Sequence, residues 1–112
     1  MGTYTQIIYQ IVFSPKDRAR TLTKPYREKL FKYINGILKN KKCHSYQING
    51  VEDHLHIFTH LYPSVSLASL VKDIKLASSD YIKRNGLFAN FDGWQQGYSA
   101  FTYSIKEKDR LI

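Results

Sequence analysis

The chain has 112 residues, which suits one domain with a single core and is too short for a second. Its 17 Lys and Arg against 9 Asp and Glu give a formal charge of +8, which indicates a polyanionic partner, nucleic acid first. No apolar run approaches the roughly 20 residues that span a bilayer, and no signal peptide is evident, so we expect no membrane role. A single cysteine, Cys43, excludes an intramolecular disulfide framework and suits a reducing cytoplasm.

The first part of the chain predicts a strand followed by a helix. Thr3–Phe13 is rich in Tyr, Ile and Val, and a strand with one apolar face is the simplest interpretation. Residues 16–20 then form a basic loop. A helix is expected from about Thr23, with Pro25 in its first turn, and Asn40-Lys41-Lys42 closes it.

The middle of the chain predicts a hairpin. Residues 44–48 alternate in polarity up to Asn49-Gly50, the dipeptide that most strongly indicates a two-residue hairpin turn. The return strand is the stretch of residues 52–60, in which His54 and His56 flank Leu55.

A second helix and a last strand complete the domain. The helix is expected from an N-cap at Ser66 to Asn85-Gly86, and after a loop the segment Trp94–Tyr103 is expected to form the strand. The order β-α-β-β-α-β predicts an α+β, ferredoxin-like fold, an antiparallel sheet with two helices on one face. Residues 104–107 (SIKE) form a capping box that begins a third helix, yet the sequence reaches Ile112 about two turns later.

The two histidines of the return strand are the candidate metal ligands. His54 and His56 leave the same face of a strand, so their imidazoles can reach one divalent ion and leave a coordination position open. Spacing alone explains a pair of structural histidines equally well. His60 has the same parity, and it is either a third ligand or, as we expect, a residue at the rim. His44 is expected to be incidental, and Asp53 is expected at the hairpin end, pointing to the opposite face.

Two groups of basic residues are candidate phosphate contacts. One group, Lys16, Arg18 and Arg20, lies in the first loop, and the other, Lys72 and Lys75, lies on the second helix. A solvated charged surface is the alternative for each group. The aromatic residues of the last strand are expected in the core more often than as platforms for stacked bases.

Four segments together resemble the single-tyrosine HUH transposases of the insertion-sequence-200-like family. They are residues 4–13 (YTQIIYQIVF), 48–57 (INGVEDHLHI), 70–75 (LVKDIK) followed by Ser78-Ser79, and 94–101 (WQQGYSAF). The resemblance covers essentially the whole chain, and four motifs in order are far more specific than a histidine pair.

This resemblance implies a transposase that binds hairpins at the ends of a mobile element and cuts single-stranded DNA. It implies His54 and His56 as ligands of Mg²⁺ or Mn²⁺, a 5′-phosphotyrosine intermediate and a homodimer. The nucleophilic tyrosine of such enzymes lies on the helix after the last strand, followed four residues later by a glutamine that completes the metal site. Tyr81, Tyr98 and Tyr103 do not match that position, so the nucleophile is expected beyond Ile112.

We therefore expect residues 1–112 to be one transposase domain that lacks most of its tyrosine-bearing helix and is inactive alone. The alternative is a DNA-binding or regulatory fragment, for instance a repressor that forms mixed dimers with a complete transposase. A ferredoxin-like RNA-binding platform ranks lower, because the chain has no run of the Lys/Arg-Gly-Phe-Gly-Phe kind.

Overall fold

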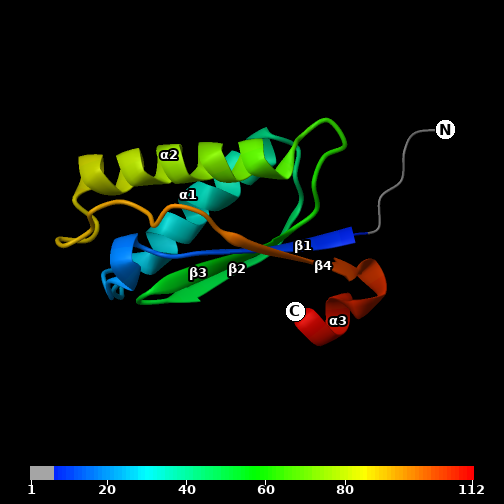
Figure 1. Cartoon of the computed structure of the whole chain (residues 1–112), viewed down its shortest axis with the longest axis horizontal. Coiled ribbons are helices and arrows are strands. Elements are labelled where there is room, and N and C mark those ends of the chain that lie inside the picture. Colours follow the sequence, from blue (N-terminus) through cyan, green and yellow to red (C-terminus); the bar gives the residue numbers. More distant parts are fainter. Residues whose placement is uncertain (1–6) are drawn as a thin grey trace.

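The computed structural model describes residues 7–112, which form a four-stranded antiparallel sheet with helices on both sides (Figure 1). The strands lie in the order β2-β3-β1-β4, so the predicted ferredoxin-like arrangement is confirmed. The elements are β1 (Ile7–Phe13), α1 (Arg27–Asn40), β2 (Ser45–Val51), β3 (His54–Thr59), α2 (Leu67–Asn85), β4 (Ser99–Ser104) and α3 (Lys108–Leu111). Short 3-10 turns cover Lys16–Arg18 and Ile105–Glu107.

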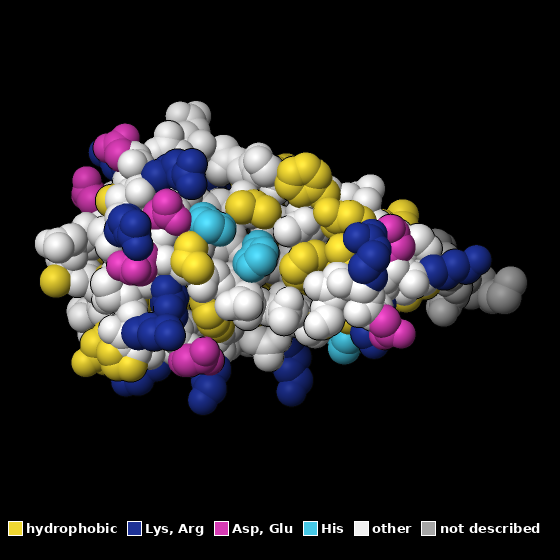
Figure 2. All heavy atoms as spheres, turned by 90° about the horizontal axis from the view of Figure 1, so that it is seen from below, with side chains coloured by type: hydrophobic (Ala, Val, Ile, Leu, Met, Phe, Trp, Pro, Cys, Tyr) yellow, Lys and Arg dark blue, Asp and Glu magenta, His cyan; other side chains and the backbone are white. Residues whose placement is uncertain are grey.

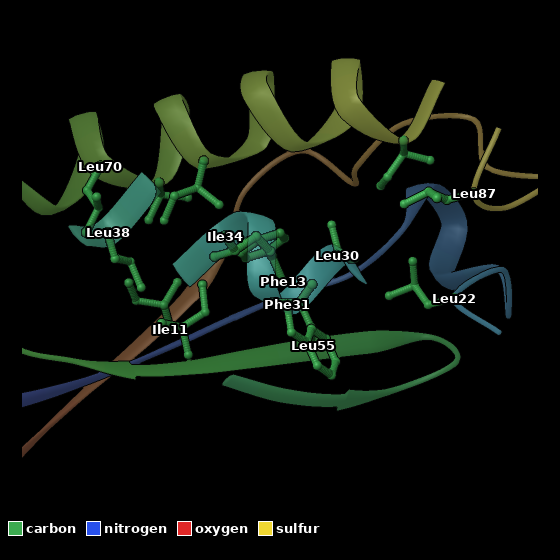
Figure 3. Packing of buried hydrophobic residues seen from close by; sticks show 14 of the residues in the cluster. Ile11, Phe13, Leu22, Leu30, Phe31, Ile34, Leu38, Leu55, Leu70 and Leu87 are labelled. Carbon is green, nitrogen blue, oxygen red and sulfur yellow. The ribbon is translucent and has the colours of Figure 1, made fainter. Parts of the chain in front are cut away.

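The two long helices cover one face of the sheet, and the core lies between them and the strands (Figures 1 and 3). In Figure 3, side chains of α1 and α2 point down onto Ile11 of β1 and Leu55 of β3. The largest fully buried side chains of this core include Ile11, Leu30, Ile34, Leu38, Leu55, Ile57, Leu70 and Ile74. Cutting any one of them back to Ala would cost about 2–5 kcal/mol of stability.

The ends of α2 follow from its capping residues, as predicted. The Ser66 hydroxyl accepts a hydrogen bond from the backbone N–H of Ser69 at 3.2 Å, which satisfies one of the free donors of the first turn. At the other end Gly86 adopts a left-handed conformation with φ of 58°, which glycine reaches without steric cost. The capping box at Ser104 is also present, and it opens the turn that leads into α3.

The predicted hairpin turn at Asn49-Gly50 is wrong, because both residues lie inside β2. Gly50 pairs with Leu55 and Val51 pairs with His54, so Glu52-Asp53 make the turn. A Cβ atom on Gly50 would lie 2.7 Å from the His54 carbonyl oxygen, so glycine is required there by close contact with β3 and not by turn geometry.

Two other element boundaries differ between the prediction and the structure, each because of local contacts or backbone conformation. The first helix begins at Arg27 and not at Thr23, because Leu22 is buried and its N–H donates to the Glu52 carbonyl at 3.0 Å, which holds the preceding segment against the hairpin turn.

The last strand begins at Ser99 and not at Trp94. Trp94 makes only an isolated bridge to Pro15, and Gly97 has φ of 86°, which interrupts the extended backbone. The part of the first strand predicted for residues 3–6 lies outside the described residues. Within residues 7–112, no helix combines the length and apolar character needed to cross a bilayer.

Two glycine substitutions should have opposite effects on stability. Gly50→Ala should lower the free energy of unfolding by at least about 1 kcal/mol, because the new Cβ would collide with the backbone of His54 and Leu55. Gly36→Ala, inside α1 with nothing within 4 Å of the added atom, should raise it by about 0.5–1 kcal/mol. Urea unfolding followed by circular dichroism measures both, and a shift of the same sign in the two variants would contradict the assigned register.

Candidate metal centre and its basic surroundings

His54 and His56 lie on the face of the sheet opposite to α1 and α2. Leu55 and Ile57, their neighbours in β3, are fully buried in the core, so strand alternation directs both imidazoles to the other face. Figure 2 views this face and shows two histidine side chains beside each other near its middle. Both side chains are partly exposed, as an open ligand site requires.

The two imidazoles are close enough to share one ion after small rotations. Their ring centres are 6.2 Å apart. An ion bonded to a ring nitrogen at about 2.1 Å lies roughly 3.2 Å from the ring centre, so two rings on one ion have centres at most about 6.5 Å apart, and the observed spacing is near that upper limit. Within residues 7–112 no group of three or more His, Cys, Asp or Glu side chains could hold a metal ion. The described donor set therefore provides two ligands and leaves the other coordination positions open.

Asp53 orients His54. Its carboxylate oxygen lies 2.9 Å from Nδ1 of His54, which leaves Nε2 free for a ligand. Metal-binding histidines commonly hold their second nitrogen in this way. The bond to His54 lowers the pKa of Asp53, and the charge of Arg18 lowers it further. Asp53 lies at the hairpin end, as predicted, but its predicted orientation to the opposite face is wrong, because strand alternation does not apply in the turn.

The surroundings of His56 favour its neutral form. Burial lowers its pKa below the ordinary value of 6.5, and the charge of His54 adds to this effect. Neutral imidazole is the form that donates a lone pair to a cation. The arrangement of His54, His56 and Asp53 therefore fits a divalent ion.

Neither of the other two histidines joins this pair. His60 lies just after the end of β3, four residues beyond His56, which is about 13 Å away at the rise of a strand. His44 precedes β2 and packs its ring against Tyr46. The rim position predicted for His60 agrees with this geometry.

A pocket of about 480 Å³ opens beside His54, and we call it the histidine pocket. Its wall includes Arg18 on one side and the irregular segment 95–98 on the other. The sequence analysis assigned residues 95–98 to a regular strand and so missed this wall. The glycines at 93 and 97, both with positive φ, were the available signal that the segment is not a regular strand.

Arg18 of the first loop lines this pocket, and each of the three basic residues predicted in that loop forms an ion pair. Arg18 lies 3.5 Å from Asp53, Arg20 lies 3.1 Å from Glu52, and Lys16 lies 3.7 Å from Asp92. All three basic side chains are more than half exposed. Exposed pairs of this kind contribute little to stability, so these cations remain available to a phosphate group.

The predicted basic residues of α2 lie at a different place. Lys72 is exposed at the surface of α2. The Lys75 ammonium donates to the backbone carbonyls of Gln95, at 2.7 Å, and Gly97, and burial lowers its pKa. Lys75 therefore fastens the segment 95–98 and does not present a free charge.

The titration of His56 should make the metal-free protein less stable as the pH falls. Because its folded pKa lies below 6.5, the unfolded chain binds more protons in the window just below that value, and stability is lost there. His56→Gln removes this titration, so its unfolding midpoint in urea should fall less between pH 7 and pH 5 than that of the parent protein. His44→Ala serves as the control, and an equal fall in the parent and in His56→Gln would exclude this role of His56.

Comparison with known proteins assigns the family. The family model described as Transposase IS200 like matches residues 3–112. The crystal structure of a transposase candidate from Deinococcus radiodurans R1 is similar, with a TM-score of 0.81 at 17% identity over 99% of this chain and 89% of that one. The structure of a REP-associated tyrosine transposase bound to a REP hairpin has a TM-score of 0.64 at 14% identity, over 99% of this chain and 67% of the other.

No curated protein sequence matches the chain. At these identities the two solved structures bear on the fold alone, and both support the α+β arrangement described above. The match of the family model extends over almost the entire chain, which decides the assignment. The chain belongs to the IS200-like transposase family.

Proposed function

We propose that the protein takes part in DNA transposition as a metal-dependent domain that binds single-stranded DNA with hairpin ends. The observation that carries this proposal is the pair of His54 and His56 on the open face of the sheet, with Asp53 holding His54 and the histidine pocket beside it. The formal charge of +8 supports a nucleic-acid partner. The structural relative bound to a REP hairpin supports a hairpin as the form of that partner.

The residues around the pocket have separate roles in this proposal. His54 and His56 would hold Mg²⁺ or Mn²⁺, which supplies polarisation of a phosphoryl oxygen when bound. Arg18 lines the pocket and would exchange its pair with Asp53 for the DNA phosphate. Lys16 and Arg20 would position the neighbouring backbone without reading its sequence.

Cleavage itself would require a tyrosine hydroxyl. Its oxygen would attack the phosphorus as the hydroxyl gives up its proton, the bond to the 3′ oxygen would break, and the products would be a 5′-phosphotyrosine and a 3′-OH whose oxygen has taken up a proton in exchange. The covalent link conserves the bond for rejoining. We assign no nucleophile within residues 7–112 and expect it on a helix that follows β4, in a cytoplasmic homodimer whose subunits complete each other's sites.

A second candidate is a protein that binds DNA without cutting it, for instance a regulator that pairs with a complete transposase. The observation that favours it concerns the tyrosine that lies beside the histidines. Tyr98 lines the histidine pocket but lies before β4, at a place that differs from the family pattern.

Metal binding should depend on the two histidines and on Asp53. His54→Ala and His56→Ala should each lower the affinity for Mn²⁺ by at least about tenfold and abolish metal-dependent binding of a hairpin-ended oligonucleotide. Asp53→Asn should lower the affinity for Mn²⁺ by about 10–100-fold, since it leaves both ligands but weakens their orientation. Calorimetry measures the metal and a gel shift measures the DNA. His44→Ala is the control, and a loss as large in that variant would contradict the assignment.

Covalent chemistry distinguishes the two candidate functions. With Mn²⁺ and a hairpin-ended single strand, the chain alone should form no protein–DNA adduct on a denaturing gel. A second subunit that carries the tyrosine helix should restore nicking in a mixed dimer if the metal centre of this chain is functional. It should fail to restore nicking if the chain only binds DNA. An adduct with the chain alone would refute our placement of the nucleophile, and Tyr98→Phe would then test the tyrosine that lines the pocket.

A further inference from the structure

A second cavity lies on the other side of the segment 95–98, between that segment and α2. It has a volume of about 670 Å³, and we call it the α2 groove. Its α2 side carries Lys72, Leu76 and Lys83, and its opposite side carries Trp94 and Tyr98. Neither the family assignment nor the metal centre accounts for this cavity.

The groove offers apolar and aromatic surface to a flat ligand. Leu76 is 63% exposed and Tyr98 is 40% exposed, values that are high for large apolar side chains. Trp94 lies deeper, where its indole N–H donates to the Ser78 hydroxyl at 3.0 Å. Aromatic rings in this setting stack against nucleobases with little regard to sequence, because every base has a π-face.

The charges of the groove favour an anion. Lys72 and Lys83 are exposed, and within residues 7–112 neither forms an ion pair. Asp80 is the acidic residue of the lining, and Arg84 neutralises it at 2.7 Å. Lys72 and Lys83 stand three helical turns apart, about 16 Å along the axis, which is longer than a single nucleotide.

The wall of the groove is held in place before any ligand arrives. Lys75 donates to the carbonyls of Gln95 and Gly97, and its ammonium also lies 5.6 Å from the ring centre of Phe13. On the other flank the Gln95 N–H donates to the Ser14 carbonyl at 2.8 Å. A wall fixed in this way loses little entropy on binding, which favours affinity.

The groove and the histidine pocket share this wall. Residues 95–98, Tyr98 among them, line both cavities. A strand that leaves the pocket beside His54 can therefore pass over Tyr98 and continue along α2. This continuity identifies an extended single strand as a better occupant than a compact anion.

We propose that the α2 groove binds unpaired nucleotides of the same DNA strand that the histidine pocket holds. A base packs against Tyr98 and Leu76, and phosphates on either side of it contact Lys72 and Lys83. The inference rests on the proposed function only in taking DNA as the partner. It assigns a second site, which needs no metal ion and no hairpin.

The single tryptophan of the chain, Trp94, reports on this site directly. In EDTA, a short oligothymidylate should quench its fluorescence in a saturable way. Tyr98→Ala should weaken binding at least about fivefold. Lys72→Gln combined with Lys83→Gln should weaken it about tenfold and should reduce the slope of log affinity against log salt by about 1.4, the value for two phosphate contacts on a single strand.

Matched controls separate this inference from the metal centre. Lys32→Gln combined with Lys39→Gln removes the same charge from the exposed side of α1 and should leave the binding unchanged. His44→Ala should also bind the oligothymidylate normally, and the use of EDTA removes the metal centre from the measurement, so failure of the metal centre and failure of the groove give different results.

Three results would overturn the inference. They are no quenching at low salt, equal weakening by the two lysine pairs, and equally tight binding of an acidic peptide, which would make the groove a general anion surface.

Discussion

The alternation of β3 between two environments is the constraint on which the rest of this structure depends. Leu55 and Ile57 are fully buried beneath α1 and α2, so His54 and His56 must project from the other face. A slip of one residue would bury both imidazoles in the core and expose two large apolar side chains. The close approach of Gly50 to the backbone of His54 and Leu55 fixes the same register from the neighbouring strand. Core packing and site geometry are therefore one requirement in this part of the sheet.

The surroundings of the histidines are assembled from segments far apart in the sequence. The loop after β1 meets the β2–β3 turn through Arg18 and Arg20, and the segment before β4 meets the same loop through hydrogen bonds of Gln95. Lys75 of α2 fastens that segment from behind. Each link is weak by itself, but together they hold the pocket wall without regular secondary structure.

The order of the elements, the fold class and the facing of the histidine pair could be predicted from the sequence, because each depends on local periodicity. The turn between β2 and β3 could not, since Asn49-Gly50 has the composition of a hairpin turn while the structure uses glycine for close contact. The partner of His54 was missed for the same reason, because the position of the turn decides where Asp53 points. The role of Lys75 depends on a contact across twenty residues, which periodicity does not reveal.

The position of α3 has a consequence for the two histidines. This helix lies on the side of the sheet opposite to α1 and α2, at one end only (Figure 1). Its Lys108 ammonium lies 5.7 Å from the ring centre of Tyr46. Along this face of β3, His54 next to the turn is partly exposed, whereas Phe58 further along the strand is buried. The strand thus runs through a gradient of effective dielectric constant. Two residues of the same type have different surroundings along it, since a carboxylate holds His54 and burial lowers the pKa of His56.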